Sequence, residues 1–214
     1  MLQGVKPAFA VLILAAGQGR RMGRTKAMAP WGEGTLLDDA IHRARQLGLP
    51  VQVMVGAGYP LVRFRCAAVP SRWCLVPDWS EGMAAALREG LARMPVNLAG
   101  TLVMAVDQPL VPVSHLELLL ERAREHPQRP VATDADGCAM VPAYLPKATW
   151  HELRGVQGDA GARQLLRSRG AAVERCREAA MDLDTWEALR RADPEVISRA
   201  DHPARQCLRR ICPG

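Results

Sequence analysis

The chain has 214 residues, a formal net charge of +6 at pH 7 and only 4% aromatic residues. This length suits one domain with a sizeable core, and the excess positive charge suits an anionic ligand. The sequence has no basic patch interleaved with aromatic residues, so we do not expect it to bind nucleic acid. No apolar run reaches the ~18 residues of a membrane span, and the N-terminus lacks a secretion signal. We therefore expect a cytoplasmic protein that does not bind a membrane.

Short apolar runs alternate with helical patterns along the chain, which is typical of a mostly parallel sheet covered on both faces. The expected strands are 10–15, 51–55, 73–76, 100–105, 129–133, 138–143 and 171–175. The expected helices are 35–47, 60–68, 81–94, 113–126, 149–155, 160–168 and 185–192. Thr35 is the expected N-cap of the first helix and Gly48 the glycine that ends it. The predicted fold is α/β, a three-layer α/β/α sandwich with a Rossmann-like, mostly parallel sheet.

The periodicity fades after Ala192. We therefore expect one domain over residues 1–193 and a basic C-terminal tail, partly disordered, over residues 194–214. Cys207 and Cys212 lie in this tail, and a metal site or a disulfide formed by them stays an alternative to free thiols.

A glycine-rich loop follows the first expected strand, with glycines at positions 17, 19 and 23. Glycine lets the main chain approach a ligand closely, and successive exposed N–H groups form an anion-binding concavity. The loop contains no acid, and its cations are Arg20, Arg21, Arg24 and Lys26. Because arginine and lysine side chains bind phosphate oxygens, the loop is predicted to bind a polyphosphate.

Two familiar phosphate loops do not fit this segment. Its glycine spacing is one residue longer than the dinucleotide-binding fingerprint, and the second strand ends in Gly56-Ala57-Gly58 without the acid that binds a ribose. No Gly-Lys-Ser/Thr follows, which excludes a P-loop. An ordinary turn with solvated arginines is the remaining alternative.

Three carboxylates are candidate metal ligands. Asp107 ends the apolar run 101–106, where a carboxylate is costly to desolvate unless it is paired or bound to a cation; capping the next helix is the alternative. Asp182 and Asp184 alternate along an extended segment, so only one of them can easily share an ion with Asp107. Asp184 is also a candidate N-cap of the helix at Thr185.

Six motifs occur in one order along the chain. They are Leu14-Ala15-Ala16-Gly17-x-Gly19-x-Arg21-Met22-Gly23-x-x-Lys26, Trp79-Ser80-Glu81-Gly82-Met83, Val106-Asp107-Gln108-Pro109, Val141-Pro142-Ala143, Gly158-Asp159-x-Gly161-Ala162-Arg163 and Asp182-Leu183-Asp184-Thr185. Over roughly residues 9–193 this set resembles the MobA-like nucleotidyltransferases, and it is most similar to their molybdenum cofactor cytidylyltransferase branch. The resemblance implies a nucleotide-diphospho-sugar transferase-like fold.

The resemblance also implies roles for single residues. Arg21 and Lys26 would be catalytic, holding the triphosphate and the acceptor phosphate, and Asp107 with Asp184 would hold Mg²⁺. The nucleotide would contact Leu14, Ala15, Ala16, Gly17, Gly19, Arg20, Lys26, Gly82 and Asp107. The acceptor would contact Met140, Asp159, Arg163 and Asp182, although loop geometry alone is the alternative for the 158–163 motif.

The implied reaction transfers a nucleoside monophosphate, CMP from CTP, to a phosphate-bearing acceptor such as molybdopterin, and a client molybdoenzyme is a possible partner. The chain departs from the family pattern at Val76–Asp78, Ala84–Ala86, Met140 and Trp186–Ala188. The resemblance implies that these positions would line the base and acceptor pockets. Two other classes stay open: an NAD(P)-dependent oxidoreductase on the same scaffold, and a non-catalytic partner that carries a cofactor to a molybdoenzyme.

Overall fold

The computed structural model describes residues 8–19, 22–23, 25–155, 161–181 and 183–192. The strands are β1 (Phe9–Ala15), β2 (Pro30–Trp31), β3 (Gly34–Thr35), β4 (Val51–Val55), β5 (Arg72–Leu75), β6 (Gly100–Ala105), β7 (Val131–Ala135), β8 (Cys138–Pro146) and β9 (Ala172–Arg175). The α-helices are α1 (Leu36–Gln46), α2 (Leu61–Arg65), α3 (Met83–Ala92), α4 (Val113–Glu125), α5 (Gly161–Ser168) and α6 (Trp186–Ala192). The 3-10 helices are η2 (Lys26–Met28), η3 (Trp79–Glu81), η4 (Lys147–Gly155) and η5 (Arg177–Ala180).

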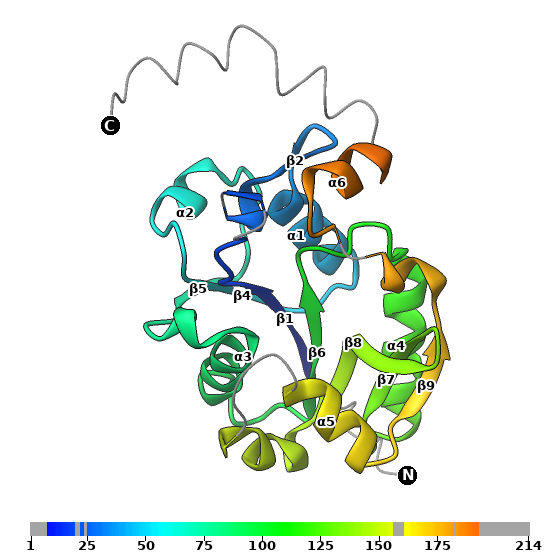
Figure 1. Cartoon of the computed structure of the whole chain (residues 1–214). Helices are drawn as coiled ribbons and strands as arrows, with labels where there is room; N and C mark the ends of the chain where they lie inside the picture. The colour runs from blue at the N-terminus through cyan, green and yellow to red at the C-terminus, as the bar shows by residue number, and fades with distance from the viewer. Residues whose placement is uncertain (1–7, 20–21, 24, 156–160, 182, 193–214) are drawn as a thin grey trace, which may run out of the picture.

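A seven-stranded sheet forms the centre of the molecule, in the order β5-β4-β1-β6-β8-β7-β9 (Figure 1). β1 pairs in parallel with β4 and β6, and β4–β5 and β7–β9 are also parallel. β8 runs antiparallel to both β6 and β7. The predicted mostly parallel sheet is therefore confirmed, with β8 as the reversed strand.

The sheet is buried on both faces, which confirms the three-layer α/β/α architecture. Along β1, Val11 and Ile13 belong to a core that includes residues of α1 and α4, whereas Leu12 and Leu14 belong to a core that includes residues of α3 and α5. Figure 1 shows α3 and α5 together on the second face. Because alternate side chains of a strand point to opposite faces, a strand that is apolar at every position is buried on both.

The start and end of α1 follow the sequence prediction. The amide of Asp38 donates to the Thr35 hydroxyl at 3.2 Å, and the amide of Thr35 donates to the Asp38 carboxylate at 3.0 Å, which together form a capping box. Gly48 follows the C-cap residue Leu47 with φ +68°, a conformation that glycine adopts without strain. The helix therefore has a defined length, and it fixes the loop before it against the sheet.

Several elements differ from the predicted ones. The β2–β3 hairpin was not predicted, because two-residue strands are too short to show an alternating pattern. The expected helix at 149–155 is part of the 3-10 helix η4, and the helix expected from residue 81 begins at Met83 after a separate 3-10 turn, η3. The expected tail, 194–214, lies outside the described residues.

Within the described part of the chain, every helix is too short or too polar to cross a membrane.

Candidate active site

The loops after β1 and β6 meet because their strands are parallel neighbours. Leu14 is in register with Ala105, so both strands end at the same edge of the sheet. Open α/β sheets bind ligands in the crevice outside the carboxyl ends of such strands. A pocket of about 280 Å³ lies there, lined by Leu14, Ala15, Ala16, Gly17, Gly19, Lys26, Ala27, Gly82, Met83, Ala86, Ala105, Val106, Asp107 and Asp184.

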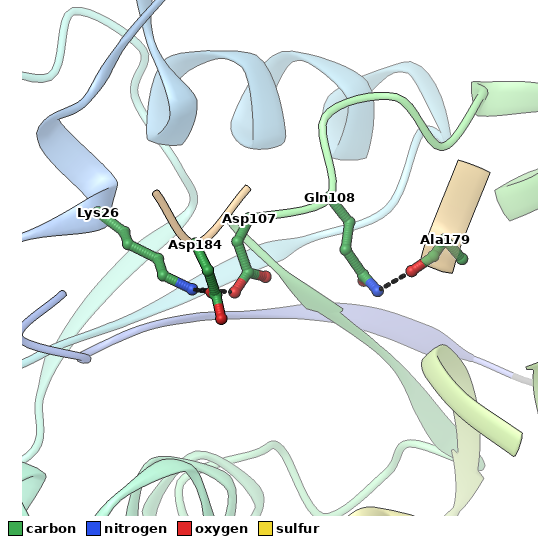
Figure 2. Close-up of polar contacts among 5 residues, drawn as sticks. All are labelled: Lys26, Asp107, Gln108, Ala179 and Asp184. Carbon is green, nitrogen blue, oxygen red and sulfur yellow. Dashed lines mark hydrogen bonds and ion pairs between the residues drawn. The ribbon is translucent and has the colours of Figure 1, made fainter. Parts of the chain in front are cut away.

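One side of this pocket is ionic. The Lys26 Nζ lies 2.6 Å from Asp107 Oδ2 and also forms a short contact with Asp184 Oδ1 (Figure 2). Lys26 begins η2, Asp107 lies two residues beyond the end of β6, and Asp184 lies two residues before α6. Three segments far apart in the sequence therefore bring one ammonium group and two carboxylates together.

The charge state of Lys26 follows from these contacts. Burial by itself lowers the pKa of Lys26, but the charges and hydrogen bonds of Asp107 and Asp184 outweigh it, so the pKa is raised above its usual value of 10.5. A lysine with a raised pKa contributes stability that is complete below 10.5 and is lost only as the pH rises through the higher folded value. The Lys26 ammonium therefore stays charged at neutral pH.

The two carboxylates also fit a divalent cation. Both already contact a single cationic group, and carboxylate oxygens are the protein ligands that Mg²⁺ prefers, usually one or two of them with phosphate oxygens and water. The described residues contain no cluster of three or more His, Cys, Asp or Glu side chains that could hold a metal by themselves. A metal here would thus need ligands from a bound substrate.

The role of Asp184 as a helix cap is not supported. The amide of Ala188 donates to the Thr185 hydroxyl at 3.1 Å, so Thr185 takes the capping position and Asp184 points to Lys26 instead. The alternative that Asp184 only caps α6 is therefore wrong. Asp182 lies outside the described residues.

The glycine-rich loop forms the next part of the wall. Gly19 and Gly23 both have φ +64°, and a Cβ on Gly17 or Gly23 would meet nothing within 4 Å, so the main chain is open to a ligand there. The amide of Met22 donates to the Gly19 carbonyl at 2.9 Å, which closes a turn within the loop. The predicted catalytic Arg21 and nucleotide-binding Arg20 lie outside the described residues.

The opposite side of the pocket is apolar. It consists of the end of β1, from Leu14 to Ala16, and the start of α3, where Gly82 has φ +98° and Met83 and Ala86 face the cavity. The resemblance gave Gly82 as a nucleotide contact and included Ala86 among the positions of the base and acceptor pockets, but it assigned no contact to Met83. Met83 and Ala86 are three residues apart and therefore lie on one face of the first turn of α3. This spacing directly after Gly82 is the sequence feature that could have indicated that both line the pocket.

The expected acceptor residues do not line this pocket where the structure describes them. Met140 lies in β8 and packs against the core on the α1–α4 face. Arg163 lies exposed on α5. Asp159 lies outside the described residues. Their proposed contact with an acceptor therefore stays a prediction.

Gln108 follows Asp107 in the turn after β6. In the structure it is buried at 1% exposure, and its Nε2 donates to the Ala179 carbonyl at 3.0 Å (Figure 2). The Leu183 amide donates to the Asp107 carbonyl at 2.9 Å. The turn after β6 is thus held against the C-terminal segment that carries Asp184.

The chain is similar in sequence to known proteins. The chain is 32% identical over 200 residues to the nicotine blue oxidoreductase of Paenarthrobacter nicotinovorans, covering 86% of this chain and 96% of that protein. It is 32% identical over 126 residues to a molybdenum cofactor guanylyltransferase of Mesorhizobium japonicum, covering 56% of this chain and 57% of that protein.

A solved structure with the same architecture is that of Rv0371c from Mycobacterium tuberculosis H37Rv. It has 26% sequence identity and a TM-score of 0.77, covering 87% of this chain and 97% of that one. A further structure of Rv0371c is a complex with manganese, with 25% identity, a TM-score of 0.72, and coverage of 86% of this chain and 97% of that one.

The MobA-like NTP transferase domain matches residues 11–175, a range that holds the glycine-rich loop, Lys26 and Asp107. The chain therefore belongs to the MobA-like NTP transferase family, with the fold of nucleotide-diphospho-sugar transferases.

Proposed function

We propose that this nucleotidyltransferase uses Mg²⁺ to transfer CMP from CTP to the phosphate of molybdopterin. The observation that carries the proposal is the convergence of Lys26, Asp107 and Asp184 at the mouth of a pocket whose opposite wall is apolar. Such a site matches a nucleoside triphosphate, which has a flat, largely apolar base at one end and a highly charged chain at the other.

The chemistry needs positioning and charge stabilisation rather than a covalent intermediate. An oxygen of the acceptor phosphate attacks the α-phosphorus and forms the new P–O bond. The bond from that phosphorus to the oxygen that bridges it to the β-phosphate breaks, and pyrophosphate leaves with the electron pair. Lys26 would hold phosphate oxygens and offset the negative charge that develops at the α-phosphorus, as Arg21 would from the same loop.

Mg²⁺ fits the carboxylates of Asp107 and Asp184, as described above, and when bound it would neutralise charge on the nucleotide phosphates. Rv0371c, which shares the fold, has been solved with manganese, another divalent ion that prefers oxygen ligands. The amides near Gly17 and Gly19 would donate to phosphate oxygens.

The choice of CTP as donor rests on two sequence motifs, and the choice of molybdopterin as acceptor rests on the name of a relative. The Ala15-Ala16-Gly17 and Asp107-Gln108-Pro109 motifs resemble the CTP-using branch, whereas the Mesorhizobium relative is a guanylyltransferase, so GTP is the direct competitor. That relative's name also includes the molybdenum cofactor, which supports molybdopterin as the acceptor. A client molybdoenzyme would then receive the product.

The test is a panel of the four ribonucleoside triphosphates with Mg²⁺ and molybdopterin, measuring pyrophosphate release and product mass. We expect pyrophosphate with CTP, a product heavier by one CMP unit, and loss of at least about 100-fold in turnover for Asp107→Asn. The matched control is Asp136→Asn, the same change at an exposed turn residue whose φ of +53° asparagine tolerates. No pyrophosphate with any triphosphate would contradict the proposal and favour a non-catalytic carrier.

A second candidate function follows from the Paenarthrobacter relative, which is named an oxidoreductase and is matched over 96% of its own length. An NAD(P)-dependent oxidoreductase would have to bind the dinucleotide without an acid after β4, which ends in Gly56-Ala57-Gly58. NADPH binding at micromolar or lower concentration without any divalent ion, together with no pyrophosphate release, would favour this candidate over nucleotidyl transfer.

A further inference from the structure

Trp186 contacts the glycine-rich loop from the other end of the chain. Its indole Nε1 donates to the main-chain carbonyl of Met22 at 3.0 Å, a hydrogen bond between residues 164 positions apart. Met22 lies between Gly19 and Gly23, the two loop glycines with positive φ. The indole therefore contacts the loop between two glycines, where the backbone is conformationally permissive.

Side-chain packing supports the same contact. Met22 is 4% exposed and belongs to a small apolar cluster separate from the two main cores, formed with Ala29, Leu36, Leu183 and Leu189. Trp186 packs against this cluster. Met22 is thus packed with Leu183 and with Leu189 of α6, in addition to the hydrogen bond.

The short stretch 183–186 contacts each part of the ionic side. The Leu183 amide donates to the Asp107 carbonyl, Asp184 contacts Lys26, and Trp186 donates to Met22. These three contacts come from four consecutive residues. A loop attached to this stretch keeps its place relative to both carboxylates.

We propose that Trp186 is a positioning residue for nucleotide binding: its N–H fixes the glycine-rich loop relative to Asp107 and Asp184. This inference rests on the proposed function, in which the loop binds the triphosphate. Without the anchor, a loop with three glycines would have to be ordered at each binding event, at a cost in affinity.

The test compares two tryptophans that make the same kind of hydrogen bond. Trp186→Phe removes the N–H and keeps an aromatic ring. The control, Trp150→Phe, removes the indole donor to the Leu145 carbonyl, a bond of 3.1 Å in a part of the molecule away from the pocket. We expect Trp186→Phe to raise the nucleotide KM and dissociation constant about 3- to 10-fold, the scale of one neutral hydrogen bond, with kcat within about twofold.

Amide hydrogen exchange of the peptide spanning residues 17–26 gives a readout that does not need turnover. We expect faster exchange of this peptide in nucleotide-free Trp186→Phe than in Trp150→Phe, and equal exchange for both once nucleotide is saturating. If Trp186→Phe unfolds, benzothienylalanine placed at position 186 removes the N–H while keeping the ring shape.

The outcomes separate this inference from the proposed function. Unchanged loop exchange, or an equal rise of KM in both variants, would overturn the role of Trp186 even in an active enzyme. Faster loop exchange and weaker nucleotide binding in a protein that releases no pyrophosphate would support the positioning role while contradicting the transferase proposal.

Discussion

The two sides of the pocket are built in different ways. The ionic side takes Lys26, Asp107 and Asp184 from three remote segments and holds them through contacts between charges. The apolar side takes Leu14 to Ala16 from the end of one strand and Met83 and Ala86 from the start of one helix. The ionic side suits any nucleoside triphosphate, whereas the shape of the apolar side can distinguish one base from another.

Changing the ionic side should have the largest effect. Lys26→Met should reduce turnover at least about 100-fold, because a donor to the transferring phosphate is lost. The same change should strengthen Mn²⁺ binding to the nucleotide-free protein, because the ammonium that now lies between Asp107 and Asp184 is gone. Steady-state rates and Mn²⁺ titration by electron paramagnetic resonance measure the two effects.

The control for this prediction is Lys147→Met, which removes an exposed lysine whose Nζ contacts the Val96 carbonyl instead of a carboxylate. Its rate and Mn²⁺ affinity should match those of the unchanged protein. Weaker Mn²⁺ binding in Lys26→Met would show that the ammonium does not compete with a metal for the two carboxylates.

A change on the apolar side should have a smaller effect that depends on the base. Ala86 is 3% exposed and lines the cavity, so Ala86→Leu places three extra carbons where we expect the base. Overpacking of this kind commonly costs 1 to 3 kcal/mol, or roughly 5- to 150-fold in affinity. Calorimetric titration should show a larger loss for GTP than for CTP, because a purine is bulkier.

Ala92→Leu makes the same change at an exposed position at the end of α3 and serves as the control. Equal losses of CTP and GTP affinity in Ala86→Leu would place the base elsewhere and leave the apolar side without a role in selection.

The smallest expected effect lies outside the pocket, at His115 on α4. Its Nε2 lies 2.9 Å from the Thr133 hydroxyl, which itself donates to the Pro142 carbonyl, so the ring is the donor. Burial lowers the pKa of His115 below its usual 6.5, although Glu174 and Glu178 partly oppose this. The folded state thus favours the neutral ring, and the stability that this provides is lost as the pH falls below 6.5.

His115→Gln keeps a donor without a titratable ring. Urea unfolding at pH 7.5 and 5.5 should show a smaller loss of unfolding free energy on acidification for His115→Gln than for the unchanged protein. An identical pH dependence would mean that His115 is as easily protonated in the folded chain as in the unfolded one.

Much of the site could be predicted from the sequence because its residues follow directly on strongly apolar strands. The glycine-rich loop after β1 and Asp107 after β6 were both recognised in this way, and the parallel pairing of the two strands then places them together. Met83 was given no contact, because an apolar residue at a helix start resembles an ordinary core position.

The role of Asp184 shows the limit of sequence patterns. Alternation placed Asp182 and Asp184 on opposite faces but left both metal binding and capping open for Asp184. The Thr185 hydroxyl accepts the capping hydrogen bond, and the Leu183–Asp107 contact brings Asp184 to Lys26. Both facts depend on how the C-terminal segment packs, which no local pattern encodes.

The α/β class and the central strands could be predicted from the sequence alone, because burial periodicity acts over a few residues, and phosphate binding by the first loop stays a prediction from its glycines and cations. Three features appear only in the folded chain: β8 runs antiparallel, Lys26 lies between two carboxylates, and Trp186 reaches Met22. Those features join segments up to 164 residues apart, where the free energy of packing and of paired charges, rather than local conformational preference, selects the partner.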